Sequence, residues 1–234
     1  MNEHTSTAAP GPDWSRIDTV ILDMDGTVLD LHFDNRFWLH HLPAVYAERN
    51  GLAHDDALAH LVGLFAGQQG SLNWYCTDYW SAQVGFDVAA LKPALRHLIR
   101  ERQDAFAFLA AVRASGRRLW LATNAHRASL ELKLAETTLG RWFDVIVSSH
   151  DYGAPKEDQV FWRALRAAHP FDPARALFID DSESVLDSAA RFGVGQLRTI
   201  ITPDSRKPPR QGLRYPALDQ FSELGLVPAM APLP

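Results

Sequence analysis

The stretch that decides the fold is DTVILDMDGTVLD, residues 18–30. Its short apolar run, Val20–Leu22, is bounded by turn-forming residues, which is typical of a buried strand. Asp23 and Asp25 follow, and side chains two residues apart on an extended chain point to the same side. Asp and Gly also favour ordinary turns and helix caps, so the pair is not diagnostic alone. We predict a buried strand that presents two carboxylates and leaves through a sharp turn at Gly26.

Similar apolar runs follow further along the chain, and each ends in a polar cluster. They are Leu119–Ala122 in RRLWLATNAH, Val145–Val147 in FDVIVSSHD, Ala176–Ile179 in RALFIDDSE, and a weaker run in GQLRTIIT at 195–202. Amphipathic stretches lie between them, at Arg127–Thr138, Glu157–Ala168 and Ser184–Phe192. Alternation of short apolar strands with helices favours an α/β protein with a Rossmann-like parallel sheet core and helices on both faces.

The stretch from Phe33 to Arg100 breaks this alternation with aromatic-rich helical sequence. It separates the first two predicted strands by about a hundred residues, far more than a simple crossover needs. We therefore predict an inserted helical cap over 33–100, and a core formed by 1–32 and 101–234 in which 1–13 is a loose tail. Scattered prolines beyond Pro203 argue against long helices or central strands there.

Composition limits the class of protein. The 234 residues are 47% hydrophobic and 22% charged, which is ordinary for a globular chain. A net charge of −5 does not indicate a basic surface that binds nucleic acid. No apolar run is long enough to span a bilayer. The N-terminus does not resemble a signal peptide, and the single cysteine, Cys76, fits a reducing compartment. We expect a cytoplasmic protein with a small-molecule substrate and no nucleic-acid or membrane partner. Its oligomeric state stays open, with a monomer favoured.

Polar residues gather at the predicted carboxyl ends of the strands, where parallel sheets bind ligands. Thr123 and Asn124 precede a helix, so they suit either an oxyanion site or a plain N-cap. Lys156 offers a point charge for a phosphate, although a lone lysine is more often solvated at the surface. Asp180 and Asp181 are adjacent carboxylates that repel each other, and a helix N-terminus accounts for only one of them. A hard cation such as Mg²⁺ would relieve both.

Together these clusters resemble the four motifs of the haloacid-dehalogenase-like (HAD) superfamily of phosphohydrolases. The motifs are DMDGT at 23–27, TN at 123–124, PKEDQ at 155–159 and DDSE at 180–183, in the family order. The resemblance implies that Asp23 is the nucleophile, that Asp25 is the acid and base, and that Thr123, Asn124 and Lys156 bind phosphate. It also implies a helical cap and a Mg²⁺ site.

The same resemblance implies the metal ligands, which are Asp23, the backbone carbonyl of Asp25, Asp180 and Asp181. The presence of Asp25 favours phosphate over halide, because dehalogenating members usually lack this second aspartate. Many members carry another carboxylate four residues after the aspartate of the fourth motif. Val185 stands at that position here, and two adjacent acids stand in its place.

A finer resemblance extends into the cap. The segments DMDGTVLDLHFDNRFW, LNWYCTDYW, TNAH, YGAPKEDQVFW and FIDDSESVLDSAA are similar to the GMP/IMP nucleotidase subgroup. This similarity implies Mg²⁺-dependent hydrolysis of purine mononucleotides to nucleoside and phosphate through an aspartyl-phosphate. Polar and aromatic cap residues are candidates for reading the base and ribose, although aromatic residues at helical spacing also form ordinary core. They are His32, Asp34, Asn35, Arg36, Trp38, Asn73, Trp74, Tyr75, Asp78 and Tyr79.

Other interpretations of the same residues remain open. The fold could serve another phosphate ester, such as a sugar phosphate, flavin mononucleotide or pyridoxal phosphate, or a mutase reaction. A non-catalytic phosphate-binding protein is a third possibility, but binding alone does not require Asp23 and Asp25 together. We expect His126 to be a residue of the helix start and Cys76 to be a buried small hydrophobe.

Overall fold

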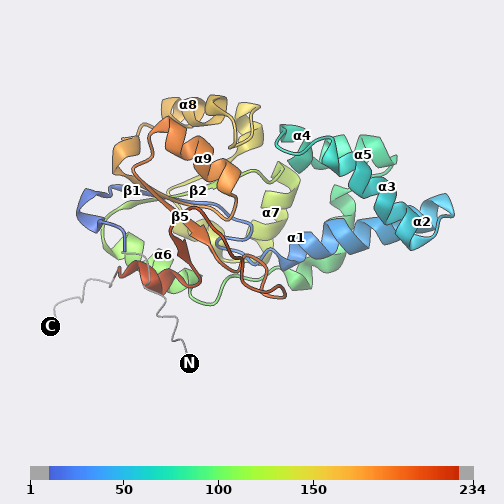
Figure 1. The fold of residues 1–234 in the computed structure, drawn as a ribbon, viewed down its shortest axis with the longest axis horizontal. Coiled ribbons are helices and arrows are strands. Elements are labelled where there is room, and N and C mark those ends of the chain that lie inside the picture. Colours follow the sequence, from blue (N-terminus) through green and yellow to red (C-terminus); the bar gives the residue numbers. More distant parts are fainter. Residues whose placement is uncertain (1–10, 227–234) are drawn as a thin grey trace.

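The computed structural model describes residues 11–226, so most of the predicted loose tail at 1–13 lies outside the described residues. A six-stranded sheet with the order β3-β2-β1-β4-β5-β6 forms the centre of the described chain (Figure 1). All its strand pairs are parallel. The strands are β1 (Thr19–Leu22), β2 (Arg118–Thr123), β3 (Val145–Ser148), β4 (Ala176–Ile179), β5 (Gln196–Ile200) and β6 (Ala217–Leu218).

The predicted α/β fold with a parallel sheet is confirmed. β1 lies in the middle of the sheet, and its last residue, Leu22, pairs with Leu121 of β2 and Ile179 of β4. The residues that follow these strands therefore emerge along one edge of the sheet. β6 is an edge strand of two residues within the proline-rich C-terminal stretch. This is consistent with the expectation that no central strand forms there.

Helices cover both faces of the sheet because β1 sends alternate side chains to opposite sides. Val20 and Leu22 pack into one apolar cluster, whereas Ile21 packs into another. Figure 1 shows α8 and α9 on one side of the sheet and α6 on the other. The core helices are α6 (Ala105–Ala114), α7 (Arg127–Glu136), α8 (Gln159–Ala168) and α9 (Glu183–Phe192), with short turns η1 (Trp14–Arg16), η4 (Leu139–Trp142), η5 (Ser149–Tyr152), η6 (Pro173–Arg175) and η7 (Phe221–Leu224).

A second group of helices lies beside the sheet, at the right of Figure 1. It has an apolar cluster of its own, which includes Phe37, Leu61 and Trp80. We propose that residues 33–100 form a cap, and use that name for them below. The elements here are α1 (His32–Arg36), η2 (Phe37–His41), α2 (Leu42–Asn50), α3 (His54–Ala66), α4 (Leu72–Tyr75), α5 (Thr77–Val84) and η3 (Ala89–Leu98).

The chain enters and leaves the cap through two neighbouring segments. Leu29 forms isolated bridges with both Asp25 and Glu101. The backbone N–H of Asp30 donates to the carbonyl of Arg100 at 2.9 Å. The connection to the cap is therefore fixed beside Asp25. Within residues 11–226, none of the helices has the length and apolarity to cross a membrane.

Candidate active site

The turn after β1 brings the first carboxylate to the edge of the sheet. The N–H of Asp23 donates to the carbonyl of Ile179 at 2.9 Å, while the Met24 side chain is fully buried in the core. Gly26 has a φ of +83°, and a Cβ at this position would lie 2.7 Å from the Asp181 carboxylate oxygen Oδ2. Glycine is therefore needed here both for the left-handed backbone and for the close approach of Asp181.

Lys156 lies beneath these carboxylates and is only 1% exposed. Its Nζ donates to Oδ1 of Asp23 at 2.5 Å, to Oδ2 of Asp180 at 2.7 Å and to the carbonyl of Ala122 at 3.0 Å. Burial lowers the pKa of this lysine, but the charges of Asp180 and Asp23 outweigh burial and raise the pKa overall. Lys156 is thus a buried cation in the site rather than a solvated surface lysine.

Three carboxylates converge next to this cation. Oxygen atoms of Asp23, Asp180 and Asp181 all lie within 4.8 Å of one another. Burial, opposed by Lys156 and reinforced by the charge of Asp180, raises the pKa of Asp23 to about 7. Burial and then the charge of Asp180 raise the pKa of Asp181 well above its ordinary value. Like charges held this close fit a hard divalent cation with oxygen ligands, so these residues suit the expected Mg²⁺.

Asp25 faces a different cation. Nζ of Lys133, on α7, donates to Oδ1 of Asp25 at 2.7 Å and to Oδ2 of Asp34, in the cap, at 2.6 Å. Lys92, also in the cap, lies 3.5 Å from Oδ1 of Asp34. Burial raises the pKa of Asp25 to about 7; Lys133 opposes this shift, and the charges of Asp34 and Asp23 add to it. A carboxyl with such a pKa can both give and take a proton near neutral pH.

Asp34, Lys92 and Lys133 are the other ionisable groups around Asp25, and their pKa values shift in different directions. Burial raises the pKa of Asp34, but Lys133 and Lys92 outweigh it, and the pKa lies below its usual value. Burial lowers the pKa of Lys92 to about 8. For Lys133 the two carboxylates outweigh burial, and its pKa is raised. The stable arrangement is therefore an ionised Asp34 held by a charged Lys133.

Sequence reasoning missed Lys133 and Lys92. A signal existed for Lys133, because it lies three residues after Leu130, and with Ser129 these residues form the buried face of α7. No comparable signal marked Lys92, which precedes a proline within η3. Asp34 was expected to face a substrate, and in the structure it lines the cavity and also makes one of the contacts between cap and core.

Thr123 and Asn124 shape the neighbouring loop. Oγ1 of Thr123 accepts a hydrogen bond from the N–H of Ala125 at 3.0 Å. Oδ1 of Asn124 accepts from the N–H of Lys156 at 2.9 Å, and its Nδ2 donates to Glu157 at 3.0 Å. Both residues therefore fix the loops that hold Lys156. Their contact with phosphate stays a prediction.

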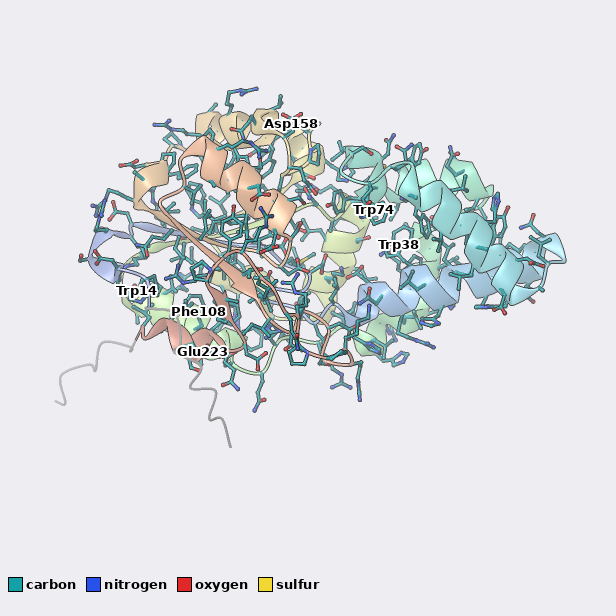
Figure 2. The ribbon with its side chains drawn as sticks, in the orientation of Figure 1. Trp14, Trp38, Trp74, Phe108, Asp158 and Glu223 are labelled. Carbon is teal, nitrogen blue, oxygen red and sulfur yellow. The ribbon has the colours of Figure 1, made fainter. Side chains whose placement is uncertain are left out.

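These groups form the base of a cavity of about 430 Å³ whose opposite wall comes from the cap. Trp38 and Trp74 belong to separate cap elements (Figure 2). The rings of both pack against Phe65. The lining includes Asp23, Asp25, Thr123, Asn124, Lys156, Asp180 and Asp181 from the core, and Asp34, Asn35, Trp38, Phe65, Trp74, Tyr75, Trp80 and Lys92 from the cap. The cavity thus combines carboxylates and a lysine of the core with aromatic residues of the cap, which also contributes Asp34 and Lys92.

Half of the ten cap candidates line this cavity, namely Asp34, Asn35, Trp38, Trp74 and Tyr75. The other five do not line it, and each has a different environment. His32 lies 3.4 Å from Asp204, Arg36 is exposed, Asn73 bonds Gln68, Asp78 lies 3.6 Å from His126, and Tyr79 packs on Trp80. His126 directly precedes α7, as expected, and its ring contacts Thr77 of the cap.

Comparison with known proteins adds family information to this geometry. Residues 17–193 match the model of the haloacid dehalogenase-like hydrolase family. The chain is 42% identical over 211 residues to a protein of Escherichia coli K12 named GMP/IMP nucleotidase YrfG. That alignment covers 90% of this chain and 95% of the relative.

Solved structures agree with the fold. A HAD phosphatase from Thermococcus onnurineus matches with a TM-score of 0.74 and 21% identity, over 89% of this chain and 96% of that one. A HAD family enzyme from Bacteroides thetaiotaomicron, described in complex with magnesium and inorganic phosphate, matches with a TM-score of 0.57 and 14% identity. This second match covers 82% of this chain and 97% of the other.

Proposed function

The chain belongs to the haloacid dehalogenase-like hydrolase family, and we propose that it is a Mg²⁺-dependent phosphatase that hydrolyses purine 5′-mononucleotides, GMP and IMP first among them. The observation that carries this proposal is a single cavity with two unlike sides. The core side supplies Asp23, Lys156 and the paired Asp180 and Asp181, and the cap side supplies aromatic residues together with Asp34 and Lys92. This arrangement suits an ester with a phosphate at one end and a flat base at the other.

Asp23 is proposed as the nucleophile. Its carboxylate oxygen attacks phosphorus, the bond from phosphorus to the ester oxygen breaks, and an aspartyl-phosphate forms. Lys156, which already holds Asp23, counters the repulsion between two anions and the charge that builds up in the transition state. Water then attacks the phosphorus of the aspartyl-phosphate, the bond from phosphorus to the Asp23 oxygen breaks, and inorganic phosphate leaves with the carboxylate restored.

Asp25 is proposed to move the protons. It gives a proton to the departing ester oxygen in the first step and takes one from the attacking water in the second. The first step needs a protonated carboxyl, and burial raises the pKa of Asp25 to about 7, which supports this role. Lys133 is proposed as a positioning residue, because its 2.7 Å contact fixes where the Asp25 carboxyl points.

Asp23, Asp180 and Asp181, together with the backbone carbonyl of Asp25, would hold the Mg²⁺. When bound, the ion supplies positive charge that offsets these carboxylates and the phosphate oxygens. The close approach of the three carboxylate side chains supports this ligand set. The Bacteroides thetaiotaomicron neighbour, described in complex with magnesium and phosphate, adds support by its similar fold.

The cap side of the cavity supports a purine substrate. Trp38 and Trp74 line the cavity, and aromatic rings of this kind can stack on a base; Asn35 is a polar residue of the same lining. GMP and IMP share a 6-oxo group and a protonated N1, whereas AMP has a 6-amino group and an unprotonated N1. A cavity built for the first pattern leaves buried polar groups unpaired with the second, so discrimination is strong.

A substrate panel tests this proposal. Phosphate release is measured from GMP, IMP, AMP, pyrimidine nucleotides, sugar phosphates, flavin mononucleotide and pyridoxal phosphate, with Mg²⁺ and with EDTA. The expected result is Mg²⁺-dependent release with the highest kcat/KM for GMP and IMP. If a sugar phosphate or pyridoxal phosphate leads by tenfold, the nucleotidase assignment is wrong and the phosphatase mechanism stands. If no ester is hydrolysed, the phosphatase proposal is also wrong.

A further inference from the structure

A second group of metal-ligating side chains lies where the cap meets the core. Cys76, His126 and His150 each bring a ligand atom within 4.8 Å of the other two. Cys76 lies between α4 and α5 of the cap, His126 precedes α7, and His150 lies in η5. None of the three is among the residues that line the cavity described above. The cluster is therefore distinct from the carboxylates of the proposed Mg²⁺ site.

His126 is held by its cap neighbours. Oγ1 of Thr77 lies 2.7 Å from its Nδ1, which leaves Nε2 as the nitrogen available to a metal. Ligating histidines usually bond through one nitrogen and use the other N–H to fix the ring, and Nδ1 of His126 fills this role in the tautomer that donates to Thr77. Oδ2 of Asp78 lies 3.6 Å from the same Nε2, so a carboxylate is within reach as a further ligand.

His150 has a nitrogen that lacks a partner. Its Nε2 is buried and makes no hydrogen bond to any part of the chain that the structure describes. A buried polar atom without a partner costs free energy, and a bound metal would remove that cost. The two imidazole centroids are 4.8 Å apart, with the rings at 89°.

The chemistry of the donors selects the metal. A thiolate and two imidazoles favour a borderline-soft ion such as Zn²⁺, whereas the all-oxygen site at Asp23 favours Mg²⁺. We propose that Cys76, His126 and His150, with Asp78 within reach as a fourth ligand, form a Zn²⁺ site that joins the cap to the core. On binding, the Cys76 thiol releases its proton to solvent and a zinc–sulfur bond forms, with no change in oxidation state.

The position of this site gives it a consequence for the cap. The corner between α4 and α5 already contacts the core through Tyr75, whose hydroxyl donates to Glu157 at 2.7 Å, and through Thr77. A metal bound to residues of both parts adds a link that must break before the cap can move away.

A Zn²⁺ titration of the reduced, metal-stripped full chain tests the site. Excess Mg²⁺ is present to occupy the carboxylates, and a chromophoric chelator competes for Zn²⁺. We expect one tightly bound Zn²⁺ per chain, with affinity weaker by about 100-fold or more in Cys76→Ser and in His150→Ala. His97→Ala, which removes an exposed histidine elsewhere in the cap, should leave the affinity unchanged. Wild-type affinity in Cys76→Ser overturns the proposal.

A Co²⁺ spectrum of the wild-type chain provides a readout that does not depend on how the variants fold. Co²⁺ at a tetrahedral site with a thiolate gives a sulfur-to-metal charge-transfer band and intense visible bands. We expect both bands at one equivalent of Co²⁺, and expect Zn²⁺ but not Mg²⁺ to remove them. Absence of the charge-transfer band in the wild-type chain contradicts ligation by Cys76 and overturns the proposal.

Discussion

Lys156 and Lys133 are both buried lysines, and each contacts one member of the Asp23–Asp25 pair. Lys156 is held entirely by core residues at the ends of neighbouring strands. Lys133 instead joins the core to Asp34 of the cap. The geometry around Lys156 is therefore fixed by the sheet, whereas the geometry around Lys133 depends on where the cap sits. Asp23, the proposed nucleophile, is thus rigidly placed, and Asp25, the proposed acid and base, is coupled to the cap.

Removal of the metal, which concerns the group around Lys156, is expected to have the largest effect on activity. Activity should disappear in EDTA and return with Mg²⁺, because the ion offsets the charge of the three carboxylates. Asp181→Ala should raise the Mg²⁺ concentration for half-maximal activity about tenfold or more. Circular dichroism checks that the variant is folded. Full turnover in rigorously metal-free buffer contradicts the assigned site.

Asp23→Asn is expected to have the second-largest effect on activity. The change keeps the shape of the side chain and removes the attacking charge, so kcat should fall by at least about a thousandfold, or roughly 4 kcal/mol of barrier. Folding should survive, since Lys156 retains Asp180 and the carbonyl of Ala122 as partners. Rates are compared at saturating substrate. Turnover near that of the wild type rules out covalent catalysis by Asp23.

Lys92→Met tests the free-energy cost of burying the charged side chain of Lys92 beside Asp34 in the cap. The pKa of Lys92 falls from 10.5 to about 8 in the folded chain, mainly through burial. Between these pH values the unfolded chain binds the proton and the folded chain does not, so the stability of the wild type rises with pH. The rise attributable to Lys92 amounts to about 3 kcal/mol. Urea unfolding between pH 7 and 10 should show that the free energy of unfolding rises less with pH in Lys92→Met than in the wild type. If the two proteins show the same pH dependence, the assigned cost of burying Lys92 is wrong.

Lys133→Met tests whether Asp25 is positioned from α7. Without Lys133 the Asp25 carboxyl loses its fixed orientation, so kcat should fall about 30-fold, or roughly 2 kcal/mol, with KM little changed. Lys207→Met, which removes an exposed lysine, is the matched control and should behave as wild type. A variant that changes KM alone shows that Lys133 serves substrate binding instead.

The group around Lys156 and the group around Lys133 also differ in how far the sequence could predict them. Strands β1 to β5 were predictable because each is a short apolar run that ends in a polar cluster, and Asp23, Lys156 and Asp180 follow such strands; the two-residue β6 was not predicted. Helix α6 received no assignment from the sequence, although its residues pack against the sheet. Lys133 and Lys92 escaped notice because their partners lie far away in sequence, and lysines on helices usually face solvent.

The central claim is that core residues carry out the hydrolysis and that aromatic cap residues recognise the base. Trp38→Ala tests this claim most directly. The kcat/KM values for GMP and for p-nitrophenyl phosphate, a small generic ester, are measured in the wild type, in Trp38→Ala and in Asp23→Asn. Loss of a stacking face should lower kcat/KM for GMP about tenfold, or roughly 1.4 kcal/mol, and leave the generic ester nearly unaffected. Asp23→Asn should lower both alike. If Trp38→Ala reduces both substrates equally, or neither, the cap does not read the base and the account is contradicted.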